Sequence, residues 1–188
     1  MRNVGSAPKR VLDVGCATGY IATVLVRIGH GVTGLELNPQ MAAEARSLGL
    51  EVIDHDLEDP LPFPEGAFDV VHACEIIEHL FDTEGFLKEL HRVLIPGGIL
   101  ILSTPNLNSL ANRLRVLVGS SLPMWGAYPQ DRHGGHIRVF NKPKLLELLS
   151  RTRFEPTEIT GINQRRLGQW LDPFPALSEM LLVKAVRR

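Results

Sequence analysis

The chain has little cysteine, no long apolar run and no leader-like start. Cys16 and Cys74 are its 2 cysteines, and they lie far apart. That spacing excludes a disulfide framework and a CxxC metal knuckle, and it makes a reducing compartment the default. No stretch reaches the length of a membrane span, and the N-terminal MRNVGSAPKR lacks the apolar core of a signal peptide. These absences predict a cytoplasmic protein without a transmembrane segment.

Excess charge is also lacking, because the formal net charge is -1, but the two signs are unevenly spread. Residues 1–94 hold 7 Lys and Arg against 15 Asp and Glu, whereas residues 95–188 hold 13 against 6. Either a basic face that favours an anionic acceptor or an ordinary solvated surface accounts for this segregation. The near-neutral total and the absence of a separate RNA-binding module argue against nucleic acid as a partner.

Apolar strand-like runs alternate with helical runs through most of the chain. Strands are predicted over residues 11–14, 31–37, 50–56, 68–74, 97–105, 155–162 and 180–188. Helices are predicted over residues 21–29, 39–49, 86–94 and 142–154, the second opened by Pro39 and the third capped by Asp82 or Thr83. The alternation predicts an α/β fold with a mostly parallel sheet and helices on both faces, in a single domain over residues 1–188.

Residues 106–140 interrupt the alternation, because they are rich in Gly, Pro, His and aromatic residues. A long irregular stretch inside a compact domain predicts a functional loop or lid. Apolar residues recur at helical spacing in its first part, at Leu110, Leu114, Leu117 and Val118. A lid over an apolar or lipid-like acceptor, a membrane-surface helix and a packed crossover all remain open. Candidate aromatic residues for an acceptor pocket are Trp125, Tyr128 and Trp170.

The stretch VLDVGCATGY, residues 11–20, leads from a predicted buried strand into a helix through Gly15 and Gly19. A helix start offers unpaired N–H groups and the positive end of a dipole, which suit a phosphate or carboxylate. Glu36 ends the next strand, about 20 residues beyond Gly15, where an acidic side chain binds the hydroxyls of a ribose. The dinucleotide fingerprint GxGxxG fails, because Ala17 and Tyr20 replace its last two glycines.

Four ordered motifs resemble those of class I S-adenosylmethionine-dependent methyltransferases: VLDVGCATGY, GLELN, DHDLEDPLPFPEGAFDVVHACEIIEHL and LKELHRVLIPGGILILSTPN. The resemblance covers residues 9–186 and implies a Rossmann-like sheet of seven strands in the order 3-2-1-4-5-7-6. It implies S-adenosylmethionine as cofactor, bound by Asp13, Gly15, Gly19, Glu36, Asp56, Leu57 and Ala73. In that family the glycines admit the methionine part, the glutamate holds the ribose, Asp56 with Leu57 faces the adenine, and the Ala73 carbonyl receives the amino group.

The segment CEIIEHL, residues 74–80, follows the fourth predicted strand. In a helix that begins there, Glu75, Glu78 and His79 share one face at positions i, i+3 and i+4. Two carboxylates and an imidazole suit Mg²⁺ or Mn²⁺. Alternatively, a Glu or His here only caps a helix or orients the acceptor.

The ExxEH element is similar to that of ubiquinone-pathway O-methyltransferases and of small-RNA 3′-terminal 2′-O-methyltransferases, where it contributes to metal binding. In the latter enzymes a further histidine, an aromatic residue four positions on and a helix complete the site, and His136 and Phe140 match that pattern. The candidate metal ligands are therefore Glu75, Glu78, His79 and His136, and the candidate catalytic residues are Glu78, His79 and His136. No chemistry is predicted for His30, His55, His72 and His91.

The resemblance implies O-methylation of a small-molecule or lipid-linked acceptor. RNA 3′-end ribose 2′-O-methylation and a non-catalytic cofactor-binding subunit remain as alternatives. Most family members carry helices ahead of the first strand, whereas here that strand begins about ten residues into the chain. We expect an unusually open acceptor site, a site covered by another chain in an oligomer, or an excised catalytic domain.

Overall fold

The computed structural model describes residues 7–122, 135–163 and 166–188, and these form one sheet flanked by helices. The strands are β1 (Arg10–Val14), β2 (Gly31–Glu36), β3 (Glu51–Asp54), β4 (Phe68–Cys74), β5 (Leu94–Pro105), β6 (Phe154–Ile162) and β7 (Met180–Arg187). Their order is β3-β2-β1-β4-β5-β7-β6, with β1 to β5 parallel and β7 antiparallel to both of its neighbours. The predicted seven-stranded order is confirmed.

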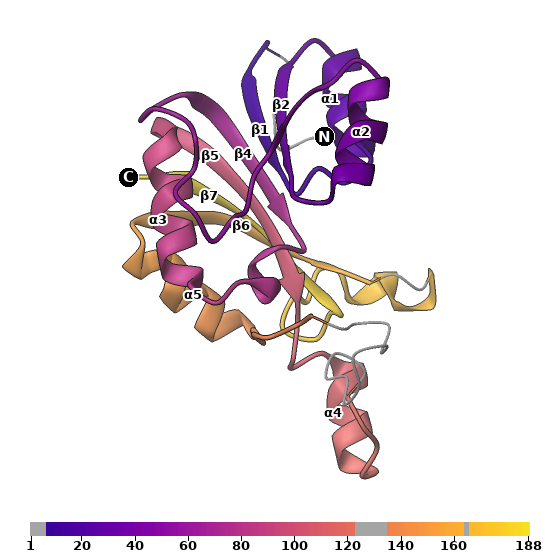
Figure 1. Ribbon diagram of the computed structural model, residues 1–188. Coiled ribbons are helices and arrows are strands. Elements are labelled where there is room, and N and C mark those ends of the chain that lie inside the picture. Colours follow the sequence, from indigo (N-terminus) through magenta and orange to yellow (C-terminus); the bar gives the residue numbers. More distant parts are fainter. Residues whose placement is uncertain (1–6, 123–134, 164–165) are drawn as a thin grey trace.

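The helices cover both faces of the sheet (Figure 1). They are α1 (Tyr20–Arg27), α2 (Pro39–Ser47), α3 (Thr83–Val93), α4 (Leu110–Leu117) and α5 (Lys142–Arg151), with short 3₁₀ helices η1 (Ile77–His79) and η2 (Arg166–Leu171). Pro39 opens α2, as predicted, where its missing N–H group is not needed. Asp82 rather than Thr83 caps α3, because its carboxylate accepts from the Gly85 amide at 2.8 Å.

Two hydrophobic clusters lie on opposite faces of the sheet. On one face α1 and α2 bury Ala22, Leu25, Ala42 and Ala45 against the sheet, and on the other α3 and α5 bury Phe86, Leu90, Leu145 and Leu149. Strands between two helical layers need apolar side chains on both faces, which explains the consecutive buried residues of β1. Because β1 to β4 are parallel, their carboxyl ends meet along one edge of the sheet.

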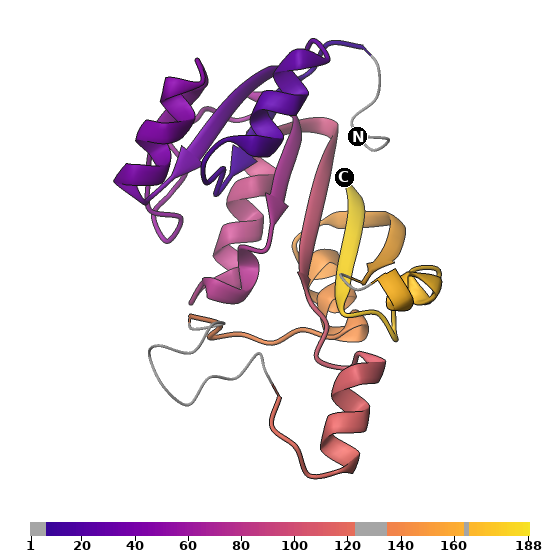
Figure 2. The same cartoon turned by 90° about the vertical axis from the view of Figure 1, so that its right-hand side faces the viewer.

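The helix α4 leaves this edge after β5 and projects away from the sheet in both views (Figure 2). Its side chains are largely exposed, at 54% for Leu114, 62% for Val116 and 80% for Leu117. Among the described residues, its first turn is anchored by the buried Ser109, which caps the helix, and by the buried Asn112. The packed-crossover interpretation is therefore wrong, because a packed helix would bury its apolar stripe.

The described parts of residues 106–140 lie outside the seven-stranded sheet, apart from one isolated bridge between Asn106 and Phe140. Trp125 and Tyr128 lie outside the described residues. The lid and the membrane-surface helix therefore stay predictions, as does the single domain over residues 1–188. Within the described ranges, no helix combines the length and the apolar character that crossing a bilayer requires.

Candidate functional site

The turn between β1 and α1 is tight and depends on its glycines. Gly15 and Gly19 have φ values of 67° and 82°, a left-handed conformation that other residues adopt at a cost. A Cβ atom on Gly15 would lie 2.2 Å from Cδ1 of Ile76, and one on Gly19 would lie 2.3 Å from Cδ1 of Leu50. Both positions therefore exclude a side chain for reasons of conformation and of space. Gly19 is the N-cap of α1 and, as a glycine, provides no side-chain hydrogen bond to the start of this helix.

Glu36, at the end of β2, joins the turn after β1 to the turn after its own strand. Its carboxylate accepts from the Ala17 amide at 2.9 Å and from the Asn38 amide at 2.8 Å. Ala17 has a φ of 48°, so the turn stays left-handed at a position that is not glycine. Glu36 and the predicted glycine turn therefore form one site across β1 and β2.

The other residues predicted to bind S-adenosylmethionine, the methyl donor, lie at or beyond the ends of the neighbouring strands. Asp56 follows β3 with an exposed side chain that accepts from the Glu58 amide at 3.0 Å, and Leu57 packs partly buried against the core. Ala73 is fully buried near the end of β4. The structure thus brings all seven predicted donor positions to the edge formed by four neighbouring strands, β3, β2, β1 and β4.

Asp13 lies inside this edge with a partner that the sequence did not indicate. Its side chain is 3% exposed, and Oδ1 lies 2.7 Å from Nδ1 of His72 on β4, its register partner. The other oxygen, Oδ2, has no hydrogen-bond partner among the described residues. Burial by itself lowers the pKa of His72, but hydrogen bonds to Asp13 and Cys74 outweigh burial and raise it to about 10. The His72 ring is therefore a protonated donor to Oδ1 of Asp13 at neutral pH.

The expected helix from Glu75 does not form. Glu75 has a φ of 58°, and its amide donates to the Ser103 carbonyl at 3.1 Å, so the chain turns sharply where β4 ends. The helix that follows, η1, has only 3 residues. Glu75 accepts from the Ser103 hydroxyl at 2.7 Å and does not share one helical face with Glu78 and His79. This part of the prediction is wrong, because strand geometry and the left-handed turn override the i, i+3, i+4 pattern.

Glu78, His79 and His136 come together beyond β4. One ligand atom from each lies within 4.8 Å of the others, whereas Glu75 is outside this group. The Glu78 carbonyl accepts from the amides of Ile137 and Arg138 at 2.9 and 3.0 Å, which holds the segment that carries His136 against η1. The rings of His79 and His136 are 4.8 Å apart between centroids. The predicted approach of His136 to this element is therefore observed, while the roles of these residues stay predictions.

Glu78 is a buried carboxylate with one oxygen left over. It is 1% exposed, Oε2 accepts from the Thr104 hydroxyl at 3.0 Å, and Oε1 has no hydrogen-bond partner among the described residues. Burial, and then the charge of Glu75, raise the pKa of Glu78 to about 7. Ser103 and Thr104 belong to the STPN segment, but the sequence did not indicate that they hold the two glutamates.

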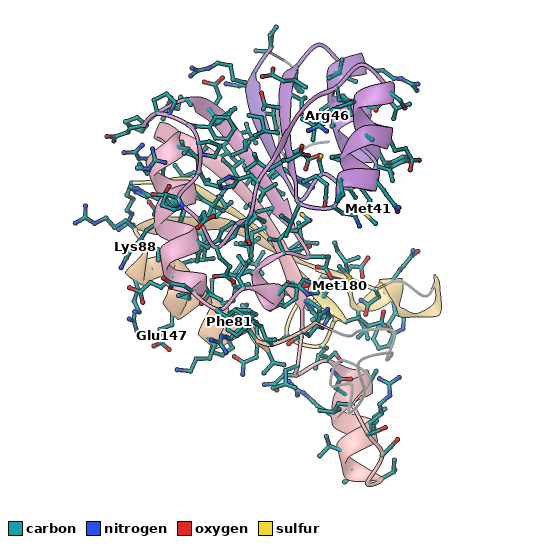
Figure 3. All side chains as sticks on the ribbon, in the orientation of Figure 1. Met41, Arg46, Phe81, Lys88, Glu147 and Met180 are labelled. Atoms are coloured by element: carbon teal, nitrogen blue, oxygen red, sulfur yellow. The ribbon has the colours of Figure 1, made fainter. Side chains whose placement is uncertain are left out.

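The His79 ring is oriented by the backbone. Its Nδ1 lies 3.0 Å from the Gly135 carbonyl, and donation to that oxygen leaves the lone pair on Nε2. This arrangement is common among histidines that bind metals, because the second nitrogen fixes the tautomer and the ring. Apolar residues border the same edge, and Figure 3 labels Met41 on α2, Met180 on β7 and Phe81 after η1. Phe81 and Trp170 are exposed and so are available to an apolar ligand.

Known proteins are similar to this chain in sequence and in fold. Residues 12–102 match the profile of a family described as a methyltransferase domain. A Mycolicibacterium smegmatis protein named "Probable S-adenosylmethionine-dependent methyltransferase" is 33% identical over 157 residues, which are 83% of this chain and 56% of that protein. A ubiquinone biosynthesis O-methyltransferase of Xanthomonas oryzae pv. oryzae is 32% identical over 163 residues, which are 83% of this chain and 66% of that enzyme. The chain thus spans less than two thirds of the length of either relative.

A solved structure shows the same fold at lower sequence identity. It is the 1,6-didemethyltoxoflavin-N1-methyltransferase of Burkholderia thailandensis with bound 1,6-didemethyltoxoflavin and S-adenosylhomocysteine. The TM-score is 0.67 and the identity 20%, and the alignment covers 96% of this chain and 71% of that one. This likeness supports the Rossmann-like sheet and its order of strands.

Proposed function

The chain belongs to the S-adenosylmethionine-dependent methyltransferases, and from this membership we propose that it methylates an oxygen atom of a small-molecule or lipid-linked acceptor. The observation that carries the choice of oxygen is the cluster of Glu78, His79 and His136 beside the donor edge. An oxygen acceptor of high pKa needs a group that removes or masks its proton, and this cluster offers such groups. The O-methyltransferase among the relatives agrees with this choice.

In this proposal the donor lies along the carboxyl ends of β3, β2, β1 and β4. The turn at Gly15 and Gly19 admits the methionine part, and Glu36 binds the ribose hydroxyls. Asp56 and Leu57 border the adenine, the Ala73 carbonyl accepts from its amino group, and Oδ2 of Asp13 accepts from the ammonium of the methionine part. The tight turn, the position of Glu36 and the unpartnered Oδ2 support these assignments.

Methyl transfer is an in-line displacement in which the acceptor oxygen bonds to the methyl carbon as the carbon–sulfur bond breaks. The sulfonium is already activated, so alignment supplies much of the acceleration. The acceptor proton passes to a base, and we assign that role to Glu78 with support from His79. A carboxylate whose pKa is about 7 is half ionised near neutral pH and is therefore suited to receive this proton.

Glu78, His79 and His136 would also hold Mg²⁺ or Mn²⁺. A buried carboxylate oxygen without a partner and a histidine anchored through Nδ1 fit such a cation, although Glu75 does not belong to the set. When bound, the cation lowers the pKa of an acceptor hydroxyl. We further propose that α4 forms one wall of a lid over an apolar part of the acceptor, because its apolar side chains are exposed.

The test measures S-adenosylhomocysteine formation with catechols, phenols, prenylated phenols, amines and an RNA oligonucleotide that ends in a free 2′-hydroxyl. We expect turnover with a phenolic or catechol acceptor. Turnover with amines alone or RNA alone contradicts the proposal, and donor binding without any turnover favours the non-catalytic subunit. Glu78→Gln and His79→Ala should lower kcat at least tenfold, whereas Glu84→Gln, which changes a partly exposed ion-pair residue on α3, should not.

A chelation experiment distinguishes cation binding by the cluster from the role of Glu78 as a base. If Glu78, His79 and His136 hold a cation, exhaustive chelation should abolish turnover, and Mn²⁺ or Mg²⁺ should restore it. Full activity in the presence of chelator would rule out a role for the cation but would leave Glu78 as the base. Unchanged turnover in both Glu78→Gln and His79→Ala removes the cluster from the reaction.

A further inference from the structure

The ion pair of Asp13 and His72 remains unexplained by packing alone. Asp13 is 3% exposed on its side chain, and its Oδ2 atom has no partner among the described residues. A buried carboxylate oxygen without a hydrogen bond is costly, so such an atom usually marks the place of a ligand or water. Its partner His72 is 19% exposed on its side chain and bonds the opposite oxygen. The carboxylate is thus held from one side and left open on the other.

We propose that His72 is a positioning residue of the donor site, which holds Oδ1 of Asp13 so that Oδ2 stays ready to accept from the cationic amino group of the donor. The inference rests on the proposed function, because it requires the donor to lie at Asp13. Parallel pairing makes the two residues neighbours, since Asp13 of β1 is in register with His72 of β4. Nδ1 therefore reaches the carboxylate without distortion of either strand, at 2.7 Å.

The neighbouring strands and the turn after β1 place further groups around Asp13 and His72. β4 adds Cys74 to the groups around His72, and β5 places Ile101 in register beside it. Burial, followed by the charges of Asp13 and Glu36, raises the pKa of the Cys16 thiol to about 11 against the opposing charge of Arg46, so Cys16 stays a neutral thiol at neutral pH. The imidazolium of His72 thus balances Asp13 until a cationic donor arrives. Without His72, Oδ1 of Asp13 would lose its hydrogen bond as well, and a buried carboxylate without partners is costly.

The experiment compares two ligands that differ in the amino acid part. S-adenosylhomocysteine carries an α-amino group and a carboxylate there, whereas 5′-methylthioadenosine has the nucleoside and a thioether but neither of these groups. Calorimetry at pH 7 should show that His72→Phe weakens the binding of S-adenosylhomocysteine at least tenfold and the binding of 5′-methylthioadenosine less than about twofold. His72→Asn, which places an amide donor near the position of Nδ1, should keep the affinity for S-adenosylhomocysteine within about threefold of the wild-type value. The matched control His91→Asn changes a histidine that bonds the Arg188 backbone, and it should change neither affinity.

A pH series adds a readout that simple loss of structure would not give. Between about pH 5.5 and 8, the S-adenosylhomocysteine affinity of His72→Phe relative to that of wild type should fall as the pH falls, because a buried carboxylate that has lost a hydrogen-bond donor is easier to protonate. Wild type and His72→Asn should show a flatter profile over the same range. A pH profile of His72→Phe parallel to that of wild type contradicts the positioning role.

Other outcomes separate this inference from the proposed function. If Asp13→Asn weakens S-adenosylhomocysteine but His72→Phe does not, the donor site stands and the positioning role is overturned. Equal losses for both ligands in His72→Phe also overturn it, since the effect is then not directed at the amino group. If wild type binds neither ligand, the proposed function fails and the inference fails with it.

A measurement on wild type covers the case in which His72→Phe does not fold. In protein labelled with ¹⁵N at its 7 histidines, the Nδ1 signal of His72 should move on addition of S-adenosylhomocysteine and stay in place with 5′-methylthioadenosine. His72→Asn identifies that signal by its absence. A His72 signal that responds equally to both ligands, or to neither, overturns the proposal.

Discussion

Gly15→Ala tests whether the turn after β1 disfavours a side chain at residue 15 for steric as well as conformational reasons. The φ of Gly15 is 67°, and an alanine in the left-handed region is disfavoured by about 1–2 kcal/mol. The added Cβ would also lie 2.2 Å from Cδ1 of Ile76, far inside van der Waals contact. Moving a packed side chain to relieve such overpacking costs about 1–3 kcal/mol more.

Gly49→Ala is the matched control, because Gly49 has a φ of 81° but nothing within 4 Å of its ideal Cβ position. It carries the conformational cost without the clash. Both variants gain a few tenths of a kcal/mol to about 1 kcal/mol from a less flexible unfolded chain. We therefore expect a loss of about 0–1.5 kcal/mol for Gly49→Ala and about 2–4 kcal/mol for Gly15→Ala.

Urea titration followed by circular dichroism measures both free energies of unfolding. Ile76→Val deletes Cδ1, the atom nearest to the added Cβ, so the double variant with Gly15→Ala should recover about 1 kcal/mol relative to additivity. Equal stability of Gly15→Ala and Gly49→Ala, or strict additivity with Ile76→Val, would refute the steric argument. The turn would then require glycine for its backbone conformation alone.

Three further results are expected. Glu36→Ala should weaken the binding of S-adenosylhomocysteine at least tenfold in calorimetry, because a charged acceptor for two ribose hydroxyls is lost. The control variant Glu44→Ala on α2 should leave this affinity unchanged. Unchanged affinity in Glu36→Ala would place the ribose elsewhere. The pKa of Glu78 is raised from 4.5 to about 7, so the folded state binds the extra proton and loses about 3 kcal/mol of stability as the pH rises through that range. Glu78→Gln should therefore exceed wild type in urea resistance at about pH 8 and match it at about pH 4, and a constant difference between them would show that Glu78 is not buried as a charge. Leu117→Lys should leave the free energy of unfolding within about 0.5 kcal/mol, since this side chain is 80% exposed, but should raise KM for an apolar acceptor; an unchanged KM would remove α4 from the acceptor site.

Local patterns were sufficient for most of the regular structure. The predicted strand over residues 68–74 coincides with β4, because a turn with Gly66 comes just before the apolar run and the acidic Glu75 follows it. Pro39 and Asp82 mark the starts of α2 and α3 through chemistry that acts within one turn. The segment from Glu75 to His79 is the counterexample. Its helical spacing is genuine, but the preceding strand and the bond to Ser103 impose a left-handed residue that the spacing does not encode.

The sequence by itself determined the α/β alternation, the glycine turn and the acidic residue at the end of β2, because each depends on residues close in the chain or on a strand end. The tertiary structure decided how distant groups touch, although the resemblance had indicated the approach of His136. His72 meets Asp13 through the register of β4 on β1, and His136 meets Glu78 through backbone bonds to Ile137 and Arg138. It also decided that α4 projects with its apolar side exposed. Helical periodicity shows that a helix has an apolar face, but only the packing of the whole chain determines whether another element covers that face.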